Sequence, residues 1–448
     1  MPMPIDWMPG AREETLNYLT ELVRLNTTNP PGNETAAARY VADRLAAAGV
    51  PAEVVEPAPG RGNVVARLDP EGTDPAQSLL LLSHLDVVPA TAAEWRRDPF
   101  GGELVDGQVW GRGTLDTKQL TAIWLTIFRR VARERLTLRR GLVFAATADE
   151  EMGGTLGVRW LEENRPELLR CGWCLNEGGG FGLVLGDVTY YPFQAGEKSP
   201  CWMTLRARGQ PGHASIPSAD NAVIRLAEAV ARIGRARLAF HLTDTVRLFV
   251  EGLAGAQAEP MAGLLRNLLH PDRAGQVLDG LSDAHLAAMV RAMLHNTATP
   301  TILRAGEKTN VIPSVAEAQV DCRILPGQTP ESLRRELEVV LADCPGVELE
   351  LGMSGQPTES PVDTDLADAI RRSLARHAPE ARLIPYLVPG ATDSRFLRPR
   401  GVVAYGFCPL LPGEDVRTIH GHDERIGVRS IEFALRVLWD VVTDFVCR

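Results

Sequence analysis

The fold is decided by one stretch, Gly141-Leu-Val-Phe-Ala-Ala-Thr-Ala148, which runs into Asp149-Glu150-Glu151 and the turn Met152-Gly-Gly-Thr155. The apolar residues do not alternate with polar ones, which is typical of a strand covered on both faces. Two adjacent carboxylates then follow at the C-terminal end of this strand. One carboxylate can bind a metal ion while the other faces a water on that ion, so the stretch points to hydrolysis.

Helix-period and strand-period segments alternate around this stretch through the first 195 residues. Helices are predicted at Arg12–Leu25, Glu34–Ala48 and Leu120–Arg133, the second of them after the turn signal Asn29-Pro-Pro-Gly-Asn33. Short apolar runs at Val64–Leu68 and Leu79–Leu82 predict further buried strands. The pattern predicts an α/β domain with a mostly parallel sheet.

The pattern changes near residue 200, where polar and apolar residues begin to alternate as in half-exposed antiparallel strands. Strands are expected at Trp202–Arg208, Glu317–Arg323 and Val347–Leu351, and helices at Ala219–Arg235 and Thr329–Ala342. This order predicts a small α+β sandwich of the ferredoxin-like kind. Between its halves, Ala236–Thr301 looks largely helical and could serve as an interface.

The α/β pattern returns at about residue 356. It contains the predicted helices Leu366–His377 and Ser430–Val446 and the predicted strands Arg382–Val388 and Gly401–Phe407. We therefore expect a catalytic domain split into residues 1–199 and 356–448, with an inserted lid or dimerisation domain at 200–355. A chain of 448 residues is long enough for two or three domains.

Composition excludes several kinds of partner. The 47 basic and 57 acidic residues give a net charge of -10 without any basic block, so nucleic acid is not expected. No apolar stretch is long enough to span a membrane, and Met1–Pro9 does not look like a secretion signal. Seven cysteines fit a reducing compartment, so we expect a cytoplasmic protein. Cys171-Gly-Trp-Cys174 has the spacing of a redox or zinc pair, but buried structural thiols are the favoured interpretation.

Other strand ends also carry residues that could bind a metal. His84 and Asp86 follow four leucines and are two positions apart, so they point the same way. A carboxylate in this position can fix the tautomer of a metal-bound imidazole. Alone, His84 would more often be a structural histidine.

Three further candidates lie in loops. Asp116 sits in the turn Gly111–Lys118 before a helix, where it is either a helix N-cap or a carboxylate bridging two ions about 3.5 to 4 Å apart. Glu177 follows the strand-like run Trp173–Asn176, and a plain loop acid is its alternative. His420 lies near the C-terminus, close to His422, and either could be merely exposed.

Together these signals are stronger than each is alone, because all fall where α/β folds gather ligands. Two histidines and three carboxylates suit two zinc-like ions that share one aspartate. The predicted cofactors are therefore two divalent metal ions, zinc first, with cobalt or manganese as alternatives.

With these residues in place, the chain resembles a family of dinuclear metallopeptidases and deacylases, the M20 family. It includes glutamate carboxypeptidase, aminoacylase-1, acetylornithine deacetylase and succinyl-diaminopimelate desuccinylase. The matching stretches, in the family's order, are Ser83–Pro89, Gly111–Lys118, Ala148–Gly153, Asn176–Gly178, Gly212–Ser215, Asn310–Pro313, Asp321–Arg323, Gly390–Asp393 and His420–Ile426.

The resemblance implies a division of the metal ligands. His84 and Glu177 would bind one ion, Glu151 and His420 the other, and Asp116 would bridge them. His422 is not the expected ligand, because the family's last motif aligns with the earlier histidine.

The resemblance also implies the remaining roles. Asp86 would orient His84, and Glu150 would be the catalytic acid and base. His213 would stabilise the oxyanion, in its own chain or across a dimer. Substrate binding would fall to Asn310, Arg323, Gly390, Ala391 and Thr392, with Arg323 as the clamp for a substrate carboxylate.

We expect a hydrolase that cleaves the amide bond of a small carboxylate-bearing substrate, an N-acyl amino acid or a short peptide. A metal-activated water would attack, with Glu150 moving its proton. The alternative is a non-catalytic small-molecule-binding protein that keeps the fold. A serine hydrolase or a phosphate-loop enzyme is not supported, because neither Gly-x-Ser-x-Gly nor a complete phosphate loop is present. A homodimer through the inserted domain is possible.

Overall fold

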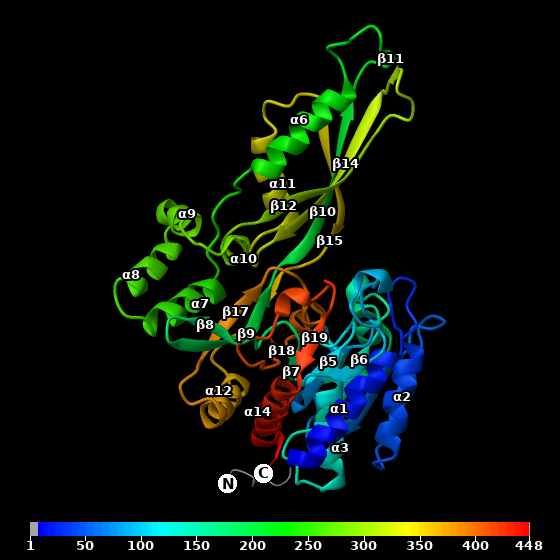
Figure 1. Ribbon diagram of the computed structural model, residues 1–448, viewed down its shortest axis with the longest axis vertical. Coiled ribbons are helices and arrows are strands. Elements are labelled where there is room, and N and C mark those ends of the chain that lie inside the picture. The colour runs from blue at the N-terminus through cyan, green and yellow to red at the C-terminus, as the bar shows by residue number, and fades with distance from the viewer. Residues whose placement is uncertain (1–7, 448) are drawn as a thin grey trace. The chain divides into compact units, whose positions relative to one another are not determined.

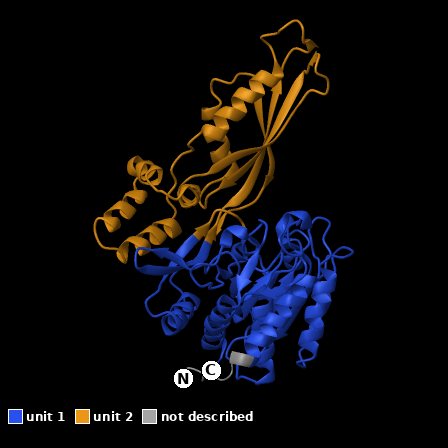
Figure 2. Ribbon diagram, viewed as in Figure 1, with its two compact units in different colours: residues 1–195, 360–386, 392–448 blue, residues 196–359, 387–391 orange. Residues whose placement is uncertain are grey.

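A computed structural model describes residues 8–447, so most of the segment Met1–Pro9 lies outside the described residues. The chain forms two compact units (Figure 2). Unit 1 contains the residues up to Ala195, Ser360–Tyr386 and those from Thr392 onward; unit 2 contains Gly196–Glu359 and Leu387–Ala391. Within the described residues, no helix has the length and apolar character needed to cross a membrane.

Unit 1 is built on one twisted sheet with its parallel strands at the centre (Figure 1). In spatial order the strands are β1 (Ala52–Val55), β2 (Asn63–Leu68), β6 (Leu142–Thr147), β3 (Leu79–His84), β7 (Trp173–Asn176), β18 (Val403–Gly406) and β9 (Val188–Glu197). The pairs β6–β3, β3–β7 and β7–β18 are parallel, whereas β1–β2, β2–β6 and β18–β9 are antiparallel. Three further strands pair with β9, namely β8 (Leu183–Leu185), β16 (Thr358–Glu359) and β17 (Arg382–Val388). The predicted α/β fold with a mainly parallel sheet is confirmed.

The central strands are apolar throughout because both faces of the sheet are covered. Every residue of β3 and β6 is buried. Successive side chains point to opposite faces. Leu79 and Leu81 therefore join one apolar cluster, and Leu80 and Leu82 join another.

Helices cover both faces of this sheet. The first cluster includes residues of α1 (Met8–Arg24), α2 (Thr35–Ala46), α3 (Lys118–Arg133), α12 (Asp365–His377) and α14 (Val428–Val446). The second includes residues of α4 (Val158–Asn164), α5 (Pro166–Leu169) and α13 (Ser394–Leu397). The helices Arg12–Leu25, Glu34–Ala48 and Leu120–Arg133 were thus predicted to within a few residues.

Two features of unit 1 bring distant loops together. Parallel strands end at one edge of the sheet, and His84 at the end of β3 pairs with Thr147 at the end of β6. A small separate sheet contains β4 (Glu103–Val105), β5 (Gln108–Trp110) and β19 (Arg425–Gly427). Because β5 pairs with β19, the turn after Trp110 lies beside the loop that precedes Arg425.

Unit 2 contains a four-stranded antiparallel sheet in the order β12, β14, β10, β15. Along the chain its elements are β10 (Ser199–Arg208), α6 (Ala222–Arg235), β12 (Thr297–Ala305), β14 (Val315–Ile324), α11 (Pro330–Val340) and β15 (Val347–Ser354). This β-α-β-β-α-β order is the ferredoxin-like sandwich, which confirms the predicted fold class of the insert.

The helical expectation for Ala236–Thr301 is wrong at its C-terminal end, where β12 begins at Thr297. β12 is an edge strand, and most of its side chains are exposed. Its sequence therefore lacks the alternation of apolar and polar residues that marks a half-buried strand. Residues 236–243 are not helical either, but most of the remaining segment is: α7 (Asp244–Gly255), α8 (Met261–Arg266), α9 (Pro271–Asp279) and α10 (Ala284–Leu294). A two-stranded ribbon of β11 (Gly212–His213) and β13 (Val311–Ile312) extends from the sheet (Figure 1).

Candidate metal centre

His84 is the last residue of β3 and is only 1% exposed. Its Nδ1 lies 2.9 Å from the backbone oxygen of Asp86 and 3.5 Å from that residue's carboxylate Oδ1. The nearer acceptor is therefore the backbone carbonyl, which holds Nδ1 in its protonated form. This leaves Nε2 as the nitrogen that can bind a metal.

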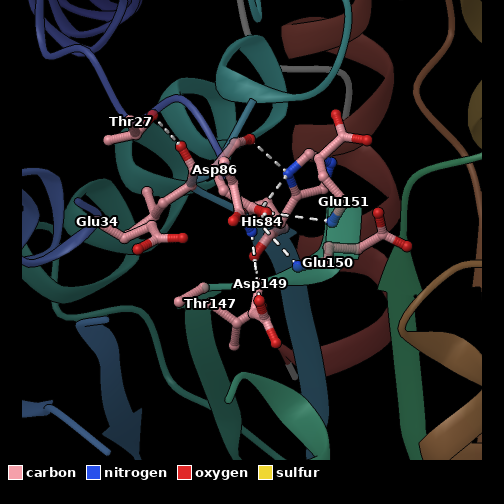
Figure 3. Close-up of polar contacts among 12 residues, drawn as sticks. Thr27, Glu34, His84, Asp86, Thr147, Asp149, Glu150 and Glu151 are labelled. Carbon is pink, nitrogen blue, oxygen red and sulfur yellow. Dashed lines mark hydrogen bonds and ion pairs between the residues drawn. The ribbon is translucent and has the colours of Figure 1, made fainter. Parts of the chain in front are cut away.

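The Asp86 carboxylate also contacts residues other than His84. It is fully buried and accepts hydrogen bonds from the backbone nitrogens of Glu150 and Glu151, both at 3.1 Å (Figure 3). It also accepts one from Asn29 Nδ2 at 2.9 Å. Burial would raise the pKa of Asp86, but its contacts with His84 and Asn29 lower it. The ionised carboxylate thus ties His84 to the turn that carries the two glutamates.

Five candidate side chains lie in two groups that share Asp116. In the first group, His84 Nε2 is 3.0 Å from Asp116 Oδ1 and 3.7 Å from Glu177 Oε1. In the second, His420 Nε2 is 3.0 Å from Asp116 Oδ2 and 3.1 Å from Glu151 Oε2. The possible ligand atoms of each group lie within 4.8 Å of one another. Each oxygen of Asp116 therefore faces a different histidine.

This cluster contains more carboxylates than imidazoles. Burial raises the pKa of Glu177 to about 8, helped by the charges of Asp116 and Glu151. Burial also raises the pKa of Asp393, which neighbours the cluster, to about 7. Hydrogen bonds to Asp116 and Glu151 raise the pKa of His420 to about 10. Burial thus favours the protonated forms of Glu177 and Asp393, and a bound cation would favour their ionised forms instead.

The donor set fits divalent metal ions. Oε1 of Glu151 is buried and, among residues 8–447, has no hydrogen-bond partner. A buried carboxylate oxygen without a donor is costly unless a cation meets it. Imidazole nitrogens and carboxylate oxygens in this ratio suit zinc, and also manganese or cobalt.

Asp116 is placed by a residue that the sequence interpretation did not single out, Glu424. This fully buried carboxylate accepts hydrogen bonds from the backbone nitrogens of Leu115 and Asp116, at 2.6 and 3.1 Å. It also accepts from the backbone of Gly113 and from Arg112 Nη1, at 3.0 and 2.7 Å. The sequence feature that could have identified Glu424 is its place in the motif His420–Ile426. The N-cap alternative for Asp116 is wrong, because the N-cap of α3 is Thr117.

Glu150 lies one residue before Glu151 in a short 3-10 turn, Glu150–Met152. Burial and the charge of Glu177 raise the pKa of Glu150 well above its usual value. Within the described part of the chain its carboxylate makes no hydrogen bond. The group is therefore available to accept a proton near the two ligand groups.

His422 lies outside both groups. Its Nε2 is 3.2 Å from Glu94 Oε2 on a separate loop.

Two further candidates, His213 and Asn310, lie in unit 2. His213 is exposed on β11, where its Nδ1 lies 2.7 Å from Ser215 Oγ. Asn310 directly precedes β13, the partner strand of β11, and its backbone oxygen accepts from Ala214. His213 and Asn310 are thus brought together at one tip of unit 2.

Arg323 lies at the other end of the same sheet. Val315, near the ribbon, pairs with Arg208, whereas Arg323 pairs with Pro200 at the opposite end of β14. The guanidinium already holds Asp321 in a two-point contact of 2.7 and 3.0 Å.

Gly390 and Ala391 belong to unit 2, whereas Thr392 is buried in unit 1. Its Oγ1 accepts a hydrogen bond from the backbone of Ser394, at the start of α13.

The chain belongs to peptidase family M20/M25/M40, which its sequence matches over residues 80–444. It is a metal-dependent hydrolase. Aminoacylase-1 of Pongo abelii is 28% identical over 442 residues, covering 96% of each chain. Human N-fatty-acyl-amino acid synthase/hydrolase PM20D1 is 28% identical over 391 residues, covering 84% of this chain and 75% of that protein.

Solved structures share the fold. The M20 family metallo-carboxypeptidase Sso-CP2 from Sulfolobus solfataricus matches with a TM-score of 0.73 and 18% identity, covering 96% of this chain and 99% of that one. Human carnosine dipeptidase 1 matches with a TM-score of 0.69 and 14% identity, covering 98% of both chains. The fold is therefore shared with a known M20 family metallo-carboxypeptidase.

Proposed function

We propose that this enzyme hydrolyses the amide bond of a small substrate with a free carboxylate, an N-acyl amino acid or a short peptide. The observation that carries the proposal is the pair of ligand groups that share Asp116, with Glu150 directly before Glu151 in the same short turn. The names of the relatives, an aminoacylase and a dipeptidase among them, agree with this substrate class.

In this proposal His84 and Glu177 would hold one divalent ion, Glu151 and His420 would hold a second, and Asp116 would contribute to both sites. Zinc is the first choice, with cobalt or manganese as alternatives. When bound, the two ions lower the pKa of a water molecule and polarise the scissile carbonyl.

The protein's own groups would then act as follows. Glu150 takes the proton of the attacking water and delivers it to the departing nitrogen, for which a raised pKa is suited. Asp86 holds the Glu150 turn through two backbone hydrogen bonds. His213 donates to the oxygen that becomes negative during attack. Arg323 binds the substrate carboxylate, and Asn310, Gly390, Ala391 and Thr392 complete the contacts.

We further propose a homodimer in which the partner subunit's His213 serves the site. At about 3.3 Å per residue, the stretch of β14 from Val315 to Arg323 is roughly 26 Å long. His213 lies beyond the Val315 end. A small amide substrate cannot span that distance, which supports the proposal that the His213 and Arg323 acting on one substrate belong to two chains.

The cytoplasm is our proposed location, which agrees with all seven cysteines being free. The domain organisation 1–199, 200–355 and 356–448 is likewise kept as a proposal.

A panel of N-acyl amino acids and dipeptides, tested with zinc, cobalt and manganese, checks the function. We expect turnover of at least one carboxylate-bearing amide and none of its amidated counterpart. Retention of the metal with no turnover of any member would instead favour a non-catalytic binding protein.

A further inference from the structure

The loop that carries Glu150 and Glu151 is anchored by the residue before them, Asp149. This residue has a left-handed backbone, φ 73°, and is 4% exposed. Its Oδ2 accepts hydrogen bonds from Thr155 Oγ1 and the backbone nitrogen of Leu156, at 2.9 and 3.0 Å. The carboxylate therefore closes the loop on itself, and its other oxygen is left for a different partner.

That partner is Arg61, which is 8% exposed. Its Nη2 donates to Asp149 Oδ1 at 2.8 Å and to Glu34 Oε1 at 2.8 Å, while its Nε donates to Glu34 Oε2 at 2.8 Å. Glu34 is fully buried. One planar guanidinium thus links the glutamate loop to an acid at the start of α2. A lysine has no such fork and cannot reproduce this geometry.

The chain around Arg61 is shaped to hold the guanidinium. Gly32 has φ 86°, and a Cβ there would lie 2.4 Å from Arg61 Cζ. In the same turn, Asn29 Nδ2 donates to Asp86 Oδ2 and to Asp149 Oδ1, at 2.9 and 3.3 Å. The segment Asn29–Asn33, which the sequence marked only as a turn, therefore contacts both carboxylates that hold the loop.

Asn63, two residues after Arg61, forms hydrogen bonds with both ends of the same loop. Its Oδ1 accepts from the backbone nitrogen of Ala148, and its Nδ2 donates to the backbone oxygen of Leu156, both at 2.9 Å. Contacts from Arg61, Asn63 and Asn29 thus converge on residues 148–156. The loop is fixed from outside as well as by its own hydrogen bonds.

We propose that Arg61 is a positioning residue for the hydrolysis, acting through Asp149 to hold Glu150 and Glu151 in place. The inference rests on the proposed function, since it takes Glu150 as the proton carrier and Glu151 as a metal ligand. Removing the guanidinium leaves Glu34 and Asp149 buried without their cation. The loop then relaxes, although no group that touches substrate or metal has changed.

The test compares Arg61→Gln with a matched control, Arg129→Gln. Arg129 is also 8% exposed and pairs with Glu14 between α3 and α1, in another part of unit 1. We measure kcat, KM and the melting temperature. Hydrogen–deuterium exchange of peptides covering residues 147–157 is followed on metal-free protein.

For Arg61→Gln we expect kcat to fall about 10- to 100-fold with KM within about twofold. The amides of Glu150 and Glu151 should exchange at least about tenfold faster. Arg129→Gln should lower the melting temperature but change neither readout more than about twofold. Arg61→Lys keeps the positive charge but not the planar guanidinium, so it should give intermediate values. It replaces Arg61→Gln in the test if that variant does not fold.

Equal kcat and exchange in Arg61→Gln and Arg129→Gln would overturn the proposal, as would wild-type values in Arg61→Lys. If the wild-type enzyme hydrolyses no substrate, the proposed function fails. The exchange comparison still decides whether Arg61 fixes the loop, so the two failures are distinguishable.

Discussion

The candidate metal centre of unit 1 and the ribbon of unit 2 hold their histidines in opposite ways. His84 is 1% exposed and is contacted by Asp86, Asp116 and Glu177. His213 is exposed, and the side-chain contacts that hold it among residues 8–447 come from Ser215, two positions away. A rigid, buried site can arrange charge before substrate binds. An exposed histidine on a ribbon contributes only when a substrate is brought to it. We therefore expect substitutions at the metal centre of unit 1 to reduce turnover directly.

The largest effect should come from Glu150→Gln. The amide cannot carry the proton of the attacking water, so we expect kcat to fall at least about a thousandfold while the metal content stays unchanged. Turnover and elemental analysis measure the two properties. Glu163→Gln on α4 is the control, because Glu163 is exposed and pairs with Arg159 on the same helix. A near-wild-type rate would remove Glu150 from the mechanism.

His213→Ala should cost about a hundredfold to a thousandfold in kcat, the usual cost of one lost oxyanion donor. If the histidine acts across a dimer, mixing this variant with Glu150→Ala should recover activity. The mixed dimers have one intact combination of His213 and Glu150. Recovery fails, despite demonstrated subunit exchange, if the histidine serves its own chain.

Glu424→Gln should weaken metal binding about 10- to 100-fold, because the amide accepts fewer of the hydrogen bonds that place Asp116. Isothermal titration with zinc measures the affinity. Glu336→Gln is the control: Glu336 accepts three hydrogen bonds in unit 2, from Ala239, His241 and Asn296, so its loss should lower stability only. Equal zinc affinities of the two variants would mean that Glu424 has no special role at Asp116.

The smallest effect should come from Asp321→Asn. Arg323 already holds Asp321 with both arms of its guanidinium, and a neutral partner competes less with a substrate carboxylate. We expect KM to fall a few-fold, whereas Arg323→Lys should raise it about tenfold. Steady-state kinetics on one substrate measures both values. Unchanged KM in both variants would rule out Arg323 as the clamp.

Much of unit 1 could be predicted from the sequence because each of its strands and helices is formed by one continuous stretch with its own apolar pattern. Apolar runs such as Leu79–Leu82 predict buried parallel strands, and the ends of such strands meet at one edge of a sheet. Candidate side chains that follow those strands, such as His84 and Glu177, were therefore expected to lie together.

Contacts between distant segments could not be predicted in this way. Glu424 reaches backbone nitrogens about three hundred residues earlier in the chain, and Arg61 reaches Asp149 across a different loop. Neither contact leaves a periodic signal, because each depends on how two turns meet in space. β12 was missed for another reason: it is an exposed edge strand that contains Pro300 and directly follows a helical segment.

The most direct test of the account is an anomalous-scattering map from crystals grown with zinc. We predict two peaks about 3.5 to 4 Å apart, one beside His84 and Glu177 and the other beside Glu151 and His420, with Asp116 touching both. A single peak, or peaks away from Asp116, would contradict the claim that one aspartate joins two ions.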